Sequence, residues 1–168
     1  MNIEYCTTYS FIRVTLVEVL IELCHQLEMT EKIEFVTNAS YNELMEKLKI
    51  AKVGLHTMKN EHFGISIVEM MAAGLLTIAH DSAGPKMDII TEQPNEKRTG
   101  YLANTQEEYA ECMRQALTLS EKEAERVRQR ARASVQRFSE PEFDQAFLQA
   151  LTPALSARGL LLNESFTK

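Results

Sequence analysis

Apolar residues recur at helical spacing along two early stretches of the chain. Over residues 14–29 the apolar positions follow an i, i+3, i+4, i+7 pattern, which predicts an amphipathic helix. A second helix is predicted from Ser40, because Glu43 stands at the capping-box distance from it and an apolar face continues at Leu44, Leu48 and Ala51. Residues 1–12 show no clean periodicity, and we assign them no element.

Short apolar runs predict four strands, at Ile33–Val36, Val53–His56, Leu75–Ala79 and Gly100–Leu102. The third run is continuously apolar, which is typical of a strand buried on both faces of a parallel sheet. Between and after these strands the pattern predicts helices over 64–73, from Pro85 to Ile90, and over 106–119, 121–138 and 141–151. Gly74, Ser120 and Ser139 stand at the expected helix ends.

This alternation predicts an α/β fold with right-handed crossovers and a parallel sheet. Four strands are fewer than a doubly wound sheet usually carries. We therefore expect a partial Rossmann-like parallel sheet with flanking helices and a helical C-terminus, lacking its first strands. The domain is expected over residues 17–151, with an unassigned segment at 1–16 and a tail at 152–168.

Charge and cysteine content narrow the classes of function. The net charge of −6 argues against a nucleic-acid partner, because a surface that tracks phosphates is usually basic. The three cysteines form no metal-ligand or disulfide spacing, which fits a reducing compartment. The most apolar early segment, 11–23, is interrupted by charges and predicts no membrane span, so this chain alone is expected to be cytosolic.

Two strand-to-helix loops carry the candidate chemistry. The loop after the 53–56 strand supplies residues 60–64, and the loop after the 75–79 strand supplies residues 80–84. In open α/β sheets ligands bind outside the carboxyl ends of the strands, so both loops are expected at one site. His56, His62 and His80 also lie near these strand ends, but they lack metal-ligand spacing and we predict no metal.

The helix predicted over 64–73 is apolar on nearly all sides, which indicates burial, and its polar exceptions are Ser66 and Glu69. A buried carboxylate needs a donor, and Glu69 would be satisfied either by a ribose diol or by a salt bridge or N-terminal helix-dipole interaction that holds the fold. The residues alone do not decide between them. Glu61 precedes the helix at the mouth of the strand, and its alternative environment is solvent. Free N–H groups at Gly64 and after Gly84 could bind a diphosphate.

The two glutamates, followed by Ala-Ala-Gly, a strand and a Gly-Pro turn, resemble the E-x7-E signature of retaining nucleotide-sugar glycosyltransferases with two Rossmann-like domains. Longer stretches resemble the GDP-mannose-dependent α-1,2-mannosyltransferases of asparagine-linked glycosylation, namely VGLHTMKNEHFGISIVEMMAAG, AHDSAGPKMDII, GYLA and RARASVQRFSEPEF. The resemblance covers about residues 17–151 and corresponds to most of the C-terminal, donor-binding domain of that family. It implies one half of the glycosyltransferase-B fold.

Carried over position by position, the resemblance implies that Glu61 is catalytic and lies beside the mannosyl group. It implies that Glu69 hydrogen-bonds the ribose hydroxyls of GDP. The remaining donor-binding positions are His62, Phe63, Gly64, Ile65, Ser82, Ala83, Gly84 and Pro85. Ala83 stands where the family usually has glycine, which matters if that position needs a positive φ.

The implied reaction is transfer of mannose from GDP-mannose with retention, without a cofactor or metal. The acceptor is a dolichol-diphosphate-linked oligosaccharide, which receives its fourth and fifth mannoses at the cytosolic face of the endoplasmic reticulum membrane. Other mannosyltransferases of the pathway are further implied partners. The acceptor-binding domain, the membrane anchor and an Arg/Lys pair for the diphosphate are expected upstream of this chain, so we expect a fragment with little or no transferase activity of its own.

Two other functions fit the sequence. One is a truncated isoform that binds nucleotide or a partner without catalysis. The other is an interaction protein that uses its three C-terminal helices, although we expect their apolar faces to pack on their own sheet.

Overall fold

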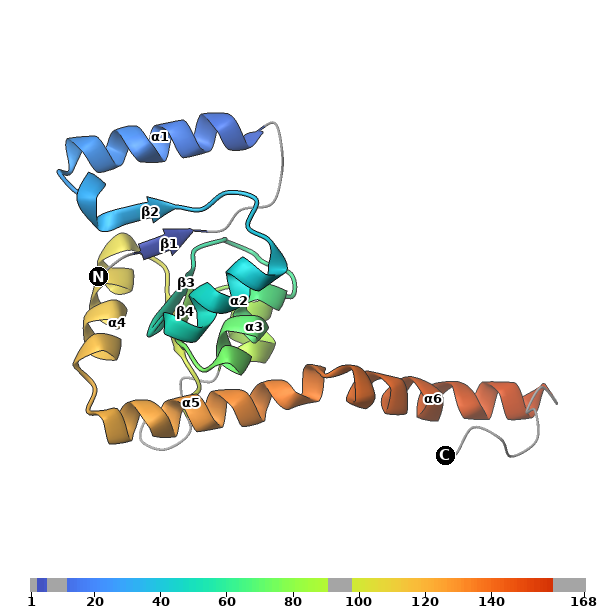
Figure 1. The fold of residues 1–168 in the computed structure, drawn as a ribbon. Helices are drawn as coiled ribbons and strands as arrows, with labels where there is room; N and C mark the ends of the chain where they lie inside the picture. The colour runs from blue at the N-terminus through green and yellow to red at the C-terminus, as the bar shows by residue number, and fades with distance from the viewer. Residues whose placement is uncertain (1–2, 6–11, 91–97, 159–168) are drawn as a thin grey trace. The chain divides into compact units, whose positions relative to one another are not determined.

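A computed structural model describes residues 3–5, 12–90 and 98–158, with side chains described from Leu16 onward (Figure 1). The chain divides into two compact units, Met1–Ile50 and Ala51–Lys168. Each unit contains parallel strands joined through helices, which confirms the predicted α/β class.

The first unit pairs two short parallel strands. Strand β1 (Ile3–Tyr5) pairs with β2 (Ile33–Phe35), and helix α1 (Ile12–Gln26) and a 3-10 turn (Thr30–Lys32) connect them. Helix α2 (Tyr41–Ile50) follows, and the Glu43 N–H donates to Ser40 Oγ at 3.3 Å, so the predicted N-cap is confirmed. Leaving residues 1–12 without an element was wrong for β1, because three residues are too few to show a period.

The second unit contains a three-stranded parallel sheet in the order β3-β4-β5. Its strands are β3 (Val53–His56), β4 (Leu76–His80) and β5 (Tyr101–Ala103). All five residues of β4 are buried, which confirms the prediction that this strand is covered on both faces. Ile78 packs in one hydrophobic cluster and Ala79 in the other, as alternating side chains of a strand must.

Helices cover both faces of β4. Helix α3 (Ile65–Ala73), the π-helical turn at Pro85–Ile89 and one side of α5 (Glu121–Val135) build the first cluster. Helix α4 (Gln106–Thr118) and other positions of α5 build the second. Ser120 caps α5 in a reciprocal capping box with Glu123, as its position predicts.

The C-terminal helices differ from the prediction in two ways. The helix predicted over 121–138 ends at Val135 and continues as a 3-10 turn (Gln136–Phe138), and α6 runs from Glu140 to Ala157, beyond the predicted end at residue 151. The expectation that the last helix packs on the sheet was wrong, because α6 buries no residue. Its Phe143 and Phe147 rings instead stack on each other with centroids 5.9 Å apart.

The end of α3 is fixed from two sides. Gly74 has φ 91°, and its N–H donates to the Met70 and Met71 carbonyls, so the predicted left-handed C-terminus is confirmed. The Arg132 guanidinium of α5 donates to the Ala72 and Ala73 carbonyls at 3.4 and 3.2 Å. A Cβ at Gly74 would lie 2.0 Å from Arg132, so glycine allows both the left-handed backbone conformation and the close approach of the guanidinium.

Candidate functional site

The carboxyl ends of the three strands of the second unit lie at one edge of the sheet. His56 is in register with Ala79, and His80 is in register with Ala103. Residues 57–64, here called the Glu61 loop, leave β3 at this edge, and residues 81–84, the Ser82 turn, leave β4 beside them. The structure therefore brings the two predicted loops together.

The Glu61 loop and the Ser82 turn are joined by two hydrogen bonds. The Asn60 N–H donates to Ser82 Oγ, and the Gly84 N–H donates to the Glu61 carbonyl, both at 2.9 Å. Gly84 lies so close to the loop that a Cβ there would be 2.3 Å from the His62 carbonyl oxygen. Contacts this short leave no room for a side chain, so the sequence needs glycine at this position.

Two residues at this junction have left-handed backbone conformations. Asn60 has φ 57°, which asparagine tolerates better than most residues, and Ala83 has φ 43°. The position where the resembled family usually has glycine does therefore have a positive φ. Alanine in this region costs about 1 kcal/mol, and the hydrogen bonds on either side of Ala83 hold it there.

Glu61 is held in a partly enclosed environment, with 23 % of its side chain exposed. One carboxylate oxygen, Oε1, accepts from the Phe63 N–H at 3.4 Å, and Oε2 lies 3.7 Å from Nε2 of His56. Burial lowers the pKa of His56, and this effect exceeds the opposing attraction of Glu61. At neutral pH His56 is therefore uncharged, so the charge of Glu61 is not cancelled by its neighbour.

A hydrogen bond connects the end of β3 to α4. The Tyr109 hydroxyl donates to the His56 carbonyl at 2.9 Å, and burial raises the pKa of Tyr109 to about 12, so the phenol stays protonated. Sequence reasoning placed His56 near the strand ends but missed its contact with Glu61. The available signal was that His56 is the last residue of its strand, directly before the loop.

Glu69 has the opposite surroundings to those expected from sequence. Its side chain is exposed, with Ile65 and Ser66 also exposed on the same helix, and it makes no hydrogen bond or ion pair within the described residues. The expected burial was wrong because neighbours cover only the face of α3 that carries Ile67, Val68 and Met71. The alternative of a salt bridge that holds the fold is likewise not what the structure shows.

The remaining predicted positions surround the start of α3. His62 is exposed, while Phe63 rests edge-on against Phe138 with ring centroids 5.2 Å apart. Gly64 is the N-cap residue with φ 93° and has no side chain to bond the first N–H groups of α3. These groups remain available to an anion. Pro85 is buried at the start of the turn that follows Gly84.

Asp81 adds polar contacts that sequence reasoning did not single out. Its carboxylate lies 3.0 Å from Lys86 Nζ and accepts from the Asn104 side-chain amide at 3.2 Å. These contacts join the Ser82 turn to the residue after β5. Within the described ranges, no cluster of three or more His, Cys, Asp and Glu side chains could hold a metal ion.

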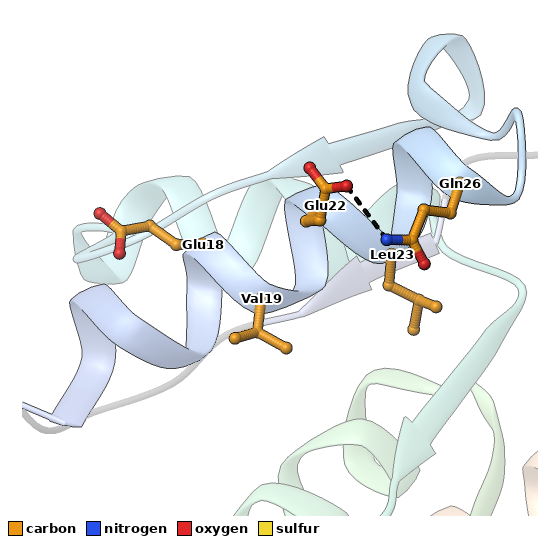
Figure 2. A pocket seen from close by; sticks show the side chains of 5 residues that line it. All are labelled: Glu18, Val19, Glu22, Leu23 and Gln26. Atoms are coloured by element: carbon orange, nitrogen blue, oxygen red, sulfur yellow. Dashed lines mark hydrogen bonds between the residues drawn. The ribbon is translucent and has the colours of Figure 1, made fainter.

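A separate pocket lies in the first unit, on the surface of α1 (Figure 2). Its lining consists of Glu18, Val19, Glu22, Leu23 and Gln26, and Gln26 donates to Glu22 at 3.0 Å. All five side chains belong to one helix, and none is a predicted site residue. No helix in the described part of the chain is long and apolar enough to cross a membrane.

The sequence matches the family described as "Glycosyl transferases group 1" over residues 15–134. It is 47% identical over 135 residues to the "GDP-Man:Man(3)GlcNAc(2)-PP-Dol alpha-1,2-mannosyltransferase" of Mus musculus, covering 80% of this chain and 27% of that protein. The protein of the same name from Dictyostelium discoideum is 42% identical over 152 residues, covering 90% of this chain and 29% of that protein. The chain thus spans well under a third of the length of these relatives.

Solved structures share the fold. A glycosyltransferase from Rickettsia africae superposes with a TM-score of 0.76 and 21% identity, over 90% of this chain and 39% of that one. Anabaena Alr3699/HepE, in complex with UDP and glucose, superposes with a TM-score of 0.74 and 19% identity, over 89% of this chain and 40% of that one. The predicted half of a glycosyltransferase-B fold is confirmed by this likeness.

Proposed function

We propose a function that follows from family membership: this chain belongs to the group 1 glycosyl transferases. It forms the nucleotide-sugar-binding part of an α-1,2-mannosyltransferase that uses GDP-mannose. Relatives named for this activity, at 41–47% identity over most of the chain, support the proposal. The observation that carries the proposal is that Glu61 and Glu69, from one motif, lie in two different environments: Glu61 is partly enclosed and accepts from the Phe63 N–H, whereas Glu69 is exposed on α3.

The environment of Glu69 suits a nucleoside. Its carboxylate has no protein partner within the described residues, and it lies on the exposed side of α3 beyond the first turn. Two vicinal ribose hydroxyls could donate to its two oxygens, because an ionised carboxylate is an acceptor only. The free N–H groups after Gly64 and the positive end of α3 favour the diphosphate of the same ligand.

The environment of Glu61 suits a developing positive charge. The bond from the anomeric carbon to the GDP oxygen breaks, and a bond from the acceptor 2-hydroxyl oxygen forms on the same face of the sugar. The leaving phosphate accepts the hydroxyl proton. Glu61, which accepts from the Phe63 N–H and lies beside a neutral His56, stabilises the oxocarbenium-like transition state electrostatically. Nothing in this scheme requires a metal.

The acceptor side of the proposal extends beyond this chain. We further propose that the complete transferase works in protein N-glycosylation at the cytosolic face of the endoplasmic reticulum membrane, as the resemblance implies. The relatives' names, which include a PP-Dol-linked glycan, support a lipid-linked acceptor. A further domain would bind this lipid-linked acceptor and exclude water. By itself, the present chain is proposed to bind donor and to transfer little or no mannose.

Calorimetric titration of this chain with GDP-mannose tests the proposal. We expect saturable heat with wild-type protein and with Glu142→Gln, a control that changes an exposed glutamate on α6. Glu69→Gln should weaken binding about tenfold, because a hydrogen bond to a charged group is worth about 1.5–3 kcal/mol. A flat wild-type titration would contradict donor binding by this chain.

A further inference from the structure

We propose that His80 is a positioning residue for the donor site and acts through the Ser82 hydroxyl. His80 Nδ1 lies 2.9 Å from Ser82 Oγ, and the same oxygen receives the Asn60 N–H at 2.9 Å. This chain of three groups, here called the His80 relay, joins the end of β4 to the Glu61 loop. The inference rests on the proposed function and adds to it a residue that does not touch the ligand.

Ser82 Oγ can bond both of its neighbours in the His80 relay at the same time. A backbone N–H only donates, so Ser82 Oγ is the acceptor for Asn60. The serine oxygen keeps its hydroxyl proton and a second lone pair for His80 Nδ1, and the tautomer of the imidazole decides which of the two atoms donates. In either direction, the contact with Nδ1 selects one orientation of the Ser82 hydroxyl.

His80 is held in place by its position at the end of a buried strand. It is the last residue of the buried strand β4, with 9 % of its surface exposed and Ala103 of β5 in register beside it. The Ser82 N–H also donates to the His80 carbonyl at 2.8 Å, which closes the backbone of the turn onto the strand. The imidazole and the serine thus have little freedom to find other partners.

The His80 relay acts on Glu61 through the residue before it. Asn60 is held by Ser82, and the Glu61 carbonyl is held by the Gly84 N–H, so the loop is fixed on both sides of the Glu61 α-carbon. Asn60 has φ 57°, a conformation that a freed loop would readily leave. Removing the hydrogen-bonding atom at His80 should let Ser82 turn away and should loosen the loop that is proposed to face the donor sugar.

Substitutions at His80 separate its hydrogen-bonding atom from its bulk. The amide of asparagine can place a donor or an acceptor close to where Nδ1 lies, so His80→Asn should keep the relay, whereas His80→Leu fills the space without a hydrogen-bonding atom. We expect His80→Leu to weaken GDP-mannose binding about tenfold, and His80→Asn to bind within about twofold of wild type. Ser134→Ala on α5 is the matched control, because it removes a hydroxyl that donates to the Ala131 carbonyl, far along the chain from the His80 relay.

A double-mutant cycle gives the decisive comparison. Because His80 acts only through the Ser82 hydroxyl, His80→Leu in a Ser82→Ala background should cost no further affinity. Additive losses, or equal losses in His80→Leu and His80→Asn, would overturn the inference. A role limited to stability would lower the unfolding temperature of His80→Leu without changing the affinity of the folded protein, and that result would overturn it as well.

A measurement without ligand distinguishes failure of the His80 relay from failure of the proposed function. In wild-type protein the Asn60 amide should be protected from hydrogen exchange, and His80→Leu should lower that protection at least about tenfold while Ser134→Ala does not. If wild type binds no GDP-mannose, the proposed function fails, and the exchange result still decides the relay. Unchanged Asn60 protection in His80→Leu would overturn the relay alone.

Discussion

Glu61 and Glu69 are the same residue type, eight positions apart, and the fold treats them in opposite ways. The Glu61 side chain is 23 % exposed, accepts from a backbone N–H and lies beside a neutral histidine. Glu69 is exposed and makes no bond within the described residues. The comparison teaches that two glutamates of one motif can have different surroundings, which is why we propose different roles for them.

The backbone accounts for this difference. Glu61 lies in a loop that is bonded on one side by Ser82 and on the other by Gly84, whereas Glu69 projects from the uncovered face of a regular helix. Changing the loop contacts should therefore affect the Glu61 region strongly. Changing Glu69 should affect only what binds there.

The largest effect on the fold is expected from Gly84→Ala. The added methyl would meet the His62 carbonyl at 2.3 Å, and backbone cannot move aside as a side chain can. We expect a loss of about 1–3 kcal/mol in the free energy of unfolding, measured by urea denaturation. Gly54→Ala is the control, since its methyl would meet the flexible Met70 thioether and should cost less. Equal losses in the two variants would show that the loop is not tightly held.

A smaller effect, confined to ligand binding, is expected at Glu69. Wild-type protein should bind GDP about tenfold more tightly than 2′,3′-dideoxy-GDP, because Glu69 loses its donors in the second ligand. Glu69→Gln should bind the two ligands with nearly equal affinity, while Glu142→Gln keeps the wild-type preference. Calorimetry measures all six dissociation constants, for three proteins with two ligands each. If Glu69→Gln still prefers GDP by the wild-type factor, the proposed contact between Glu69 and the ribose hydroxyls is contradicted.

The smallest effect is a pH dependence of stability that originates at His56. Burial lowers the pKa of His56 from its ordinary value of 6.5, so the unfolded chain binds a proton more readily than the folded one. The contribution of His56 to the free energy of unfolding should therefore be fully present above pH 6.5 and should fall as the pH drops below 6.5. It should level off below the pKa that His56 has in the folded protein. His56→Gln should flatten this part of the urea-midpoint profile, whereas His25→Gln, at an exposed histidine, should not. A profile unchanged by His56→Gln would contradict the burial of a neutral imidazole beside Glu61.

Sequence patterns located the elements around the site because their signals are local. The continuous apolar run of β4, the glycine after α3 and the serine before α5 each stand where a simple rule predicts them, and all three are confirmed. Strand β1 and the exposed faces of α3 and α6 were not predicted correctly. A short strand is defined by its pairing partner, and burial is defined by which neighbours pack, so neither can be read from a period alone.

The same limit applies to the site. Strand-to-helix order predicted that the two loops converge, but it gave no sign of the Asn60–Ser82 bond or of the His56–Glu61 contact. Those contacts depend on the register of β3 with β4, which is set by the packing of the whole sheet. The roles of the site residues stay predictions that rest on the resemblance and on this geometry.

The steady-state kinetics of Glu61→Gln and Glu69→Gln, compared in the complete transferase with GDP-mannose as the varied substrate, test the central claim most directly. Glu61→Gln should lower kcat about 100- to 1,000-fold and leave KM within a few-fold of wild type, since it removes charge stabilisation in the transition state. Glu69→Gln should raise KM about tenfold and change kcat much less. Near-normal turnover in Glu61→Gln, or the same parameter shifted in both variants, would contradict the division of roles between the two glutamates.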